Sequence, residues 1–295
     1  MKRFQVIIAP VFRRDTRRAT QRFLRNTLIL CAWSGARIRV ISEKPSDEMT
    51  ALISNLRSQM CCESVGCVVE TAPPGEMVTF LKKIVEEDEA DLLALNLEKG
   101  MMGRPVMSHD KGAVFLETNL PTLIIPGSVT FGYPPISSVL VAMAGERRQS
   151  EALRLAITLG NDNGLPVDLL HVTDNVRRDE NGSMLGNISD EFQHEYPGMV
   201  QEFIAEASPF STEKEKRCIR HFWHMRGDVS HLIRERMGED RGKLLVLEWK
   251  GSLRSGRAEV LRAILRHAGF PVLLVRPEVH GYARLRIGKD FPLAG

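Results

Sequence analysis

The sequence runs twice through the same order of apolar segments and amphipathic stretches, and this repeat limits the folds that the chain can adopt. Residues 91–100, DLLALNLEKG, match residues 243–251, KLLVLEWKG, and NLPTLIIP in the first half matches GFPVLLVRP in the second. Ala19 and Ala152 each lie ten residues after the alanine of the first apolar run in their half. Agreement at three separate places indicates a duplicated domain.

Within each half, apolar runs of strand length alternate with stretches of helical periodicity. The predicted strands are residues 4–9, 36–41, 66–71, 91–97 and 121–126, followed by 138–143, 167–172, 218–225, 243–249 and 271–277. Between the first two strands, Phe23, Leu24, Thr27, Leu28 and Cys31 fall on one face of a helix. Strands that alternate with helices predict right-handed crossovers and a mainly parallel sheet covered on both faces.

A chain of 295 residues has the length of about two domains. Glycine, proline and serine gather in residues 127–138, GSVTFGYPPISS, where the apolar periodicity stops, so this segment is predicted to be a linker. The expected domains and tail are residues 1–130, 131–280 and 281–295. The second half also has a polar insertion, residues 173–198, which leads into a predicted amphipathic helix containing Phe203 and Ile204.

The charge, the length of the apolar runs and the cysteine spacing limit the partners and the location that we expect for the protein. With 40 basic and 37 acidic residues the net charge is +3, which argues against nucleic acid or a membrane surface as the required partner. No apolar run approaches the roughly 18 residues of a membrane span, and the first run is too short for a signal peptide, so we expect a cytoplasmic protein. Irregular cysteine spacing predicts reduced thiols at Cys31, Cys61, Cys62, Cys67 and Cys218.

These residues resemble a known family, the universal stress proteins, in two tandem copies covering roughly residues 3–278. The resemblance rests on VLVAM followed by ALRLA, on LLHV, on the LLVLxxKG turn and on FPVLLVRP. It implies an α/β, Rossmann-like (adenine nucleotide alpha hydrolase-like) fold with two doubly wound domains. Each domain would have a five-stranded parallel sheet of order 3-2-1-4-5 with helices on both faces. It also implies that the last strands of the two halves pair to form a pseudo-dimer, and it leaves a homodimer open.

Family members that bind ATP end the first strand with an aspartate and follow the fourth strand with G-x2-G-x9-G-[ST], where backbone amides and a helix dipole face the phosphates. In the second half, the aspartate position falls on Ala144, and the first loop glycine falls on Glu248. Gly251 is kept, but Glu259 stands at the helix start. A carboxylate there competes with phosphate, so the second half is predicted to have lost the phosphate chemistry.

In the first half, the aspartate position falls on Val11 and the first loop glycine on Leu97. The loop itself contains no carboxylate, and two readings stay open: an anion site for ATP or a plain loop. The candidate ligand-binding residues, including the turn glycine that the second half keeps, are Gly100, Gly103, Arg104, Ser108, His109 and Gly251, with Lys111 nearby.

Two other groups of residues are candidate functional sites. Cys218, His221 and His224 are metal-ligating types, but alternation on a strand would point the two histidines to opposite faces, which favours strand surface. Arg14, Arg18, Arg22 and Arg25 share one helix face, which is either solvated or a contact for an acidic partner or RNA. On this helix face the arginines are not interleaved with aromatic residues, which would favour nucleic acid.

The sequence contains no recognisable nucleophile with a base, paired-carboxylate site or metal cage. We therefore expect a non-catalytic stress-response or regulatory protein that acts by binding another macromolecule. The alternative is a sensor of adenine nucleotides (ATP or AMP), or a slow ATP hydrolase, that uses the first half.

Overall fold

A computed structural model of the chain describes residues 4–87, 90–99, 105–106, 108–118, 120–144, 150–173, 204–205, 212–238, 242–249 and 259–276. The first half contains β1 (Val6–Val11), α1 (Arg17–Ser34), β2 (Arg37–Ser42), α2 (Ser46–Gln59), β3 (Cys67–Thr71), α3 (Met77–Glu86), β4 (Leu92–Lys99), β5 (Pro105–Val106), α4 (His109–Glu117) and β6 (Thr122–Pro126). The second half contains β7 (Ser138–Ala144), α5 (Glu151–Asn163), β8 (Val167–Thr173), α7 (Glu213–Lys216), β9 (Ile219–Arg226), α8 (Val229–Met237), β10 (Lys243–Glu248), α9 (Glu259–His267) and β11 (Val272–Val275). All the predicted strands are present, and β5 is an additional short strand that the sequence did not predict.

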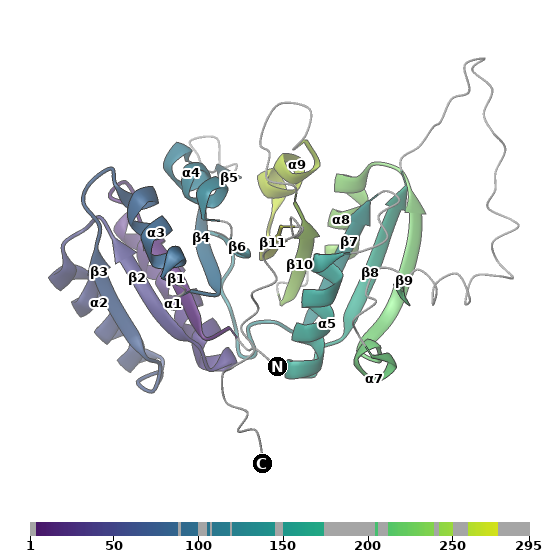
Figure 1. Cartoon of the computed structure of the whole chain (residues 1–295), viewed down its shortest axis with the longest axis horizontal. Coiled ribbons are helices and arrows are strands. Elements are labelled where there is room, and N and C mark those ends of the chain that lie inside the picture. Colours follow the sequence, from purple (N-terminus) through teal and green to yellow (C-terminus); the bar gives the residue numbers. More distant parts are fainter. Residues whose placement is uncertain are drawn as a thin grey trace, which may run out of the picture.

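The strand order confirms the predicted topology. Strands β3-β2-β1-β4-β6 and β9-β8-β7-β10-β11 each form a parallel sheet of order 3-2-1-4-5. The predicted pairing of the last strands is also confirmed, because β6 and β11 lie antiparallel with Leu123 opposite Leu273. The two halves therefore share one continuous sheet, in which two edges that would otherwise be open are paired (Figure 1).

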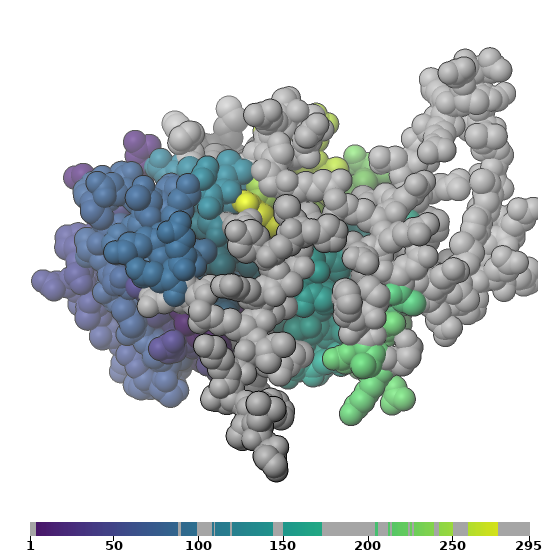
Figure 2. Space-filling model, viewed as in Figure 1, coloured from purple at the N-terminus to yellow at the C-terminus, as the bar shows by residue number. Residues whose placement is uncertain are grey.

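Helices cover both faces of this sheet. On one face, α1, α2 and α5 contribute Leu28, Ile53 and Ala156 to a single apolar cluster. On the other, α3, α4, α8 and α9 contribute the buried residues Leu81, Val114, Ile233 and Ile264. Figure 1 shows α4 and α9 near the upper ends of the central strands, and Figure 2 shows the same view with the first half in purple to blue and the second half in teal to yellow.

The first helix of each half ends in the same way. Helix α1 ends at Gly35 (φ 75°) and α5 at Gly164 (φ 64°), and each amide donates a hydrogen bond to a carbonyl in the last turn of its helix. Glycine enters this left-handed conformation without the steric cost of a side chain. The amino ends also agree, since Thr16 and Ser150 each cap a backbone amide with the side-chain oxygen.

The predicted linker is docked on α1. The Asn26 side chain donates to the carbonyl of Val129 (2.9 Å) and accepts from the amide of Phe131 (3.0 Å). Arg22 donates to the carbonyl of Gly127. Asn26, Val129 and Phe131 are all buried, so a segment that reads as a linker forms part of the packed structure. The domain boundary at residue 130 stays a prediction.

Two other predicted features fall mainly outside the described residues. Thr173 ends β8, whereas the rest of the polar insertion and the tail at residues 281–295 are not described. From the helix predicted after the insertion, Ile204 is half-buried against the cluster that contains α1 and α5. Among the described helices, none is both long and apolar enough to cross a membrane.

Candidate functional site

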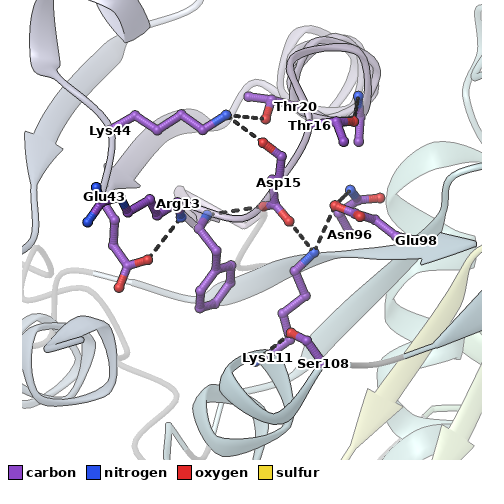
Figure 3. A network of polar contacts seen from close by, with 12 residues as sticks. Arg13, Asp15, Thr16, Thr20, Glu43, Lys44, Asn96, Glu98, Ser108 and Lys111 are labelled. Carbon is purple, nitrogen blue, oxygen red and sulfur yellow. Dashed lines mark hydrogen bonds and ion pairs between the residues drawn. The ribbon is translucent and has the colours of Figure 1, made fainter. Parts of the chain in front are cut away.

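In the first half, polar side chains gather at the carboxyl ends of β1 and β4. These strands lie side by side at the centre of the parallel sheet, at the point where the order of the strands reverses. Open α/β sheets bind their ligands in the crevice outside such a point. The loop after β1, the last residues of β4 and the first turn of α4 supply the side chains that meet here (Figure 3).

The centre of this group is a buried ion pair. The ammonium of Lys111, in the first turn of α4, lies 2.6 Å from Oδ1 of Asp15, and the two side chains are only 4% and 5% exposed. The other oxygen of Asp15 accepts a hydrogen bond from the amide of Phe12 at 3.1 Å. Lys44 donates to the main-chain carbonyl of Asp15 at 2.6 Å. The side chain and the carbonyl of Asp15 thus hold the β1–α1 loop against α4 and the end of β2.

Glu98 adds a second carboxylate to this group. Its Oε1 lies 3.4 Å from the ammonium of Lys111, and the side-chain amide of Asn96 donates to the same oxygen at 3.5 Å. Burial raises the pKa of Glu98, a hydrogen bond with the Asp15 side chain raises it further, and the positive charge of Lys111 opposes the shift. The ammonium of Lys111 therefore already has two carboxyl groups of the chain as neighbours.

The sequence-predicted candidates are only partly described. Ser108 is the exposed N-cap of α4, and its Oγ accepts from the amide of Lys111 at 3.4 Å. His109 is the first residue of that helix. Gly100, Gly103, Arg104 and Gly251 lie outside the described residues, so a ligand site formed by these residues stays a prediction.

Sequence reasoning did not identify Asp15 or Glu98. It placed the aspartate of the ATP-binding pattern at Val11, which is buried at the end of β1. Asp15 stands four residues later and turns back toward α4 to meet Lys111. A possible signal was the position of Lys111 three residues after the N-cap Ser108, in the first helical turn beside the predicted crevice.

At the matching edge of the second half, a carboxylate occupies the amino end of α5. Oε2 of Glu248, the last residue of β10, accepts a hydrogen bond from the amide of Glu151 at 3.2 Å. Glu151 is the first residue of α5, where free amides and the helix dipole favour an anion. The second carboxylate that the sequence singled out, Glu259, is the exposed first residue of α9.

Helix α4 also connects the crevice of the first half to the second half. The guanidinium of Arg276, just after β11, donates to the carbonyls of Phe115 (2.8 Å) and Leu116 (2.6 Å) in the last turn of α4. The ring of Trp249 stacks on that of Phe115 with centroids 4.2 Å apart. The helix that carries Lys111 at one end is thus held by the second half at the other end.

The suspected metal cluster has a different arrangement. Nδ1 of His221 lies 2.8 Å from the carboxylate of Asp168 on the neighbouring strand, and its ring stacks on Trp223. Cys218 precedes β9, and its thiol contacts the carbonyl of Glu215 at 3.2 Å. Within the described parts of the chain, no group of three or more metal-ligating side chains is suited to hold an ion.

Comparison with known proteins identifies the family to which the second half belongs. The model of the universal stress protein family matches residues 135–276, which run from just before β7 to just after β11. Residues 135–276 form a universal stress protein domain. This membership supports a role in the stress response. The first half repeats the strand order of the universal stress protein domain. A comparison with curated sequences finds no match.

Solved structures agree with this fold. A universal stress protein from Archaeoglobus fulgidus DSM 4304 is 13% identical, with a TM-score of 0.55 over 91% of this chain and 98% of that one. A functionally unknown protein from Pseudomonas aeruginosa PAO1 is 13% identical, with a TM-score of 0.61 over 93% of both chains. The cytoplasmic domain of a prokaryotic cation chloride cotransporter is 9% identical, with a TM-score of 0.51 over 92% and 94%. At such identities the likeness concerns the fold, which the universal stress protein domain shares with proteins of different roles.

Proposed function

We propose that the chain is a non-catalytic stress-response protein that acts by binding another macromolecule, and that its first half does not use a nucleotide. The observation that carries this proposal is the buried ion pair between Lys111 and Asp15 at the ligand-binding edge of the first sheet. In this position the protein supplies both the cation and the anion, so a phosphate would have to displace a side chain of the protein.

The energetic cost of such a displacement is large. Separating a buried ion pair leaves uncompensated charges, and loss of one partner typically costs about 3–5 kcal/mol. A phosphate bound to Lys111 would also lie beside the carboxyl groups of Asp15 and Glu98, which are within 2.6 and 3.4 Å of the ammonium. Like charges at such distances repel, and the burial of Lys111 and Asp15 reduces the screening by water.

The second half supports the same proposal. Glu248 gives the amino end of α5 a carboxylate of the chain itself, at a place where an external anion would otherwise bind. In both halves, therefore, a charged side chain of the protein occupies a position where a ligand would otherwise bind.

We propose that the chain is non-catalytic because a substrate cannot reach the buried acidic and basic groups at this edge of the sheet. Asp15, Glu98 and Lys111 are residue types that could serve in acid–base chemistry, but a catalytic group must come within hydrogen-bond distance of a substrate. The side chains of Lys111 and Asp15 are 4% and 5% exposed and already satisfy each other. We therefore assign them a structural role.

A second candidate function is an adenine-nucleotide sensor or slow ATP hydrolase in the first half. The exposed hydroxyl of Ser108 at the amino end of α4 favours it, because this end of a helix attracts anions. For this function Lys111 would have to leave Asp15 and turn toward a phosphate.

Isothermal titration calorimetry with ATP and magnesium separates the two. Our proposal predicts no saturable heat up to about 1 mM nucleotide. Micromolar binding that is abolished by Gly100→Leu and Gly103→Leu, but kept in the Gly112→Ala variant of the neighbouring helix, would establish the sensor instead.

A further inference from the structure

The surface of α1 carries positive charge that the rest of the described chain does not neutralise. Its members all have exposed side chains with no hydrogen bond or ion pair to another described residue: Arg13, Arg14, Arg17, Arg18 and Arg25. We call these five residues the arginine surface. Arg22, which the sequence grouped with them, is half-buried and donates to the carbonyl of Gly127, so it belongs to the linker contact instead.

Two carboxylates beside the start of α1, Glu43 and Asp15, have other partners. Glu43 accepts from the amide of Arg13 at 2.9 Å through one oxygen and from the amide of Gly75 at 3.1 Å through the other. Asp15 is committed to Lys111 and to the amide of Phe12. Figure 3 shows both carboxylates directed at the backbone and at buried groups. The positive charges of the arginine surface are therefore left for solvent or for a partner.

The arrangement of these residues favours a linear partner. Arg18 and Arg25 lie seven residues apart on one face of α1, which corresponds to about 10 Å along the helix axis. Arg13 and Arg14 extend the surface past the amino end of α1, where the helix dipole adds positive potential. The opposite face of α1 is fixed, because Phe23, Leu24 and Leu28 are buried against the sheet.

We propose that the arginine surface binds an acidic segment of a partner protein, an inference that rests on the proposed function and names the chemistry of its partner. A guanidinium forms paired hydrogen bonds with a carboxylate in a fixed geometry, and the arginine surface offers five groups for such contacts. The choice of a protein over nucleic acid follows from two observations. Phe23, the aromatic residue within this stretch, is buried and offers no stacking platform for bases. The chain as a whole has a net charge of only +3, whereas nucleic-acid binding draws on a strong basic excess.

The test measures fluorescence anisotropy of a labelled poly-L-glutamate peptide with the full chain at low salt. The test variant replaces Arg14, Arg18 and Arg25 with Glu. A matched control replaces three exposed arginines of the second half with Glu: Arg217, Arg220 and Arg266. Each variant has a net charge of −3, because every substitution lowers the charge of +3 by two. We expect the test variant to bind at least about tenfold more weakly than the wild type, and the control to lose much less.

Other results would overturn the inference. Absence of polyglutamate binding by the wild type would do so, as would equal losses in the two variants, which would show an effect of total charge alone. Tighter binding of oligouridylate RNA than of polyglutamate, lost in the test variant, would replace the acidic protein with nucleic acid. If the test variant has a lower unfolding midpoint than the wild type, the Arg→Gln version at the same three positions takes its place.

Failure of this inference can be distinguished from failure of the proposed function. The ATP titration reports on the crevice at Lys111, which the three test substitutions do not include. If the wild type binds neither polyglutamate nor ATP, the proposal for the arginine surface is rejected and the proposed function is kept. If the wild type binds ATP, the proposed function is rejected, whether or not polyglutamate binds.

Discussion

Lys111 and Asp15 stand 96 positions apart in the sequence, yet their charged groups meet at 2.6 Å inside the protein. The pair joins the loop after β1 to the first turn of α4, and Glu98 at the end of β4 completes the contact. Because Arg276 holds the last turn of the same helix, α4 is fixed at both ends. We propose that this arrangement closes the position that a nucleotide would otherwise take at the carboxyl ends of β1 and β4.

The first prediction concerns the stability that this ion pair confers. Lys111→Met should lower the free energy of unfolding by about 3–5 kcal/mol, because it leaves Asp15 buried without its counter-charge. The matched control is Lys82→Met, since Lys82 lies at the same 2.6 Å from Glu117 but the two side chains are 44% and 50% exposed. The control should change stability far less, because solvent screens exposed pairs.

Urea unfolding measures both variants. The double variant Asp15→Leu/Lys111→Met should cost less than the sum of its two single variants, since it removes both charges together. Equal costs for Lys111→Met and Lys82→Met would contradict the structural role of the buried pair.

The second prediction concerns pH. Burial and the Asp15 side chain raise the pKa of Glu98 above its usual 4.5, so the folded protein keeps the proton to a higher pH than the unfolded chain does. The stability from this group is fully present below about pH 4.5 and is lost as the pH rises through the raised pKa. Glu98→Gln, which stays neutral, should therefore gain stability relative to the wild type across this window.

Glu117 is the control of opposite sign. A hydrogen bond and the charge of Lys82 lower the pKa of Glu117, so its contribution is present above about pH 4.5 and is lost as the pH falls through the lowered pKa. Glu117→Gln should thus lose stability relative to the wild type as the pH rises. Urea unfolding across a pH series measures both variants, and parallel behaviour of the two would refute this assignment.

The third prediction compares two helical glycines. At Gly160 in α5, a Cβ atom would lie 2.6 Å from Cγ2 of Val167 and 3.1 Å from the carbonyl oxygen of Leu165, so Gly160→Ala should destabilise the protein by about 1–3 kcal/mol. At Gly112 in α4 nothing lies within 4 Å, so Gly112→Ala should stabilise it by about 0.5–1 kcal/mol through helix propensity. Thermal unfolding gives the sign of each change, and the same sign for both would be evidence against the close packing at Gly160.

The fourth prediction concerns the docked linker. Asn26→Ala removes the partners of the Val129 carbonyl and the Phe131 amide in a buried place, which should cost about 1–3 kcal/mol for each group left unsatisfied. It should also make residues 127–138 easier to cut by protease. Asn163→Ala, which loses a bond to the carbonyl of Leu159 in its own helix, is the control. Unchanged protease sensitivity in Asn26→Ala would mean that the linker is held by other contacts.

The residues alone were sufficient to predict the strands, for physical reasons. Buried parallel strands need continuous apolar runs, and the repeat doubled the evidence for each run. The family resemblance supplied the strand order, which the residues alone could not. It also led to the pairing of β6 with β11, in which Leu123 faces Leu273.

The candidate site was harder to predict because it depends on long-range contacts between charged residues. Asp and Lys are exposed in most proteins, so their residue types alone do not mark Asp15 and Lys111 as a buried pair. Asn26 is a similar case, because a polar residue inside a helix gives no sign that it binds a segment about a hundred positions away. Glu248 could be interpreted from the sequence, since a carboxylate had replaced a glycine of a known pattern.

The most direct test of the central claim is a crystal structure of the protein purified from cells and crystallised with ATP and magnesium. Our account predicts the ammonium of Lys111 within ion-pair distance of Asp15, and no nucleotide at the carboxyl ends of β1 and β4. A nucleotide bound between these strand ends, with Lys111 turned away from Asp15 toward its phosphates, would contradict the account.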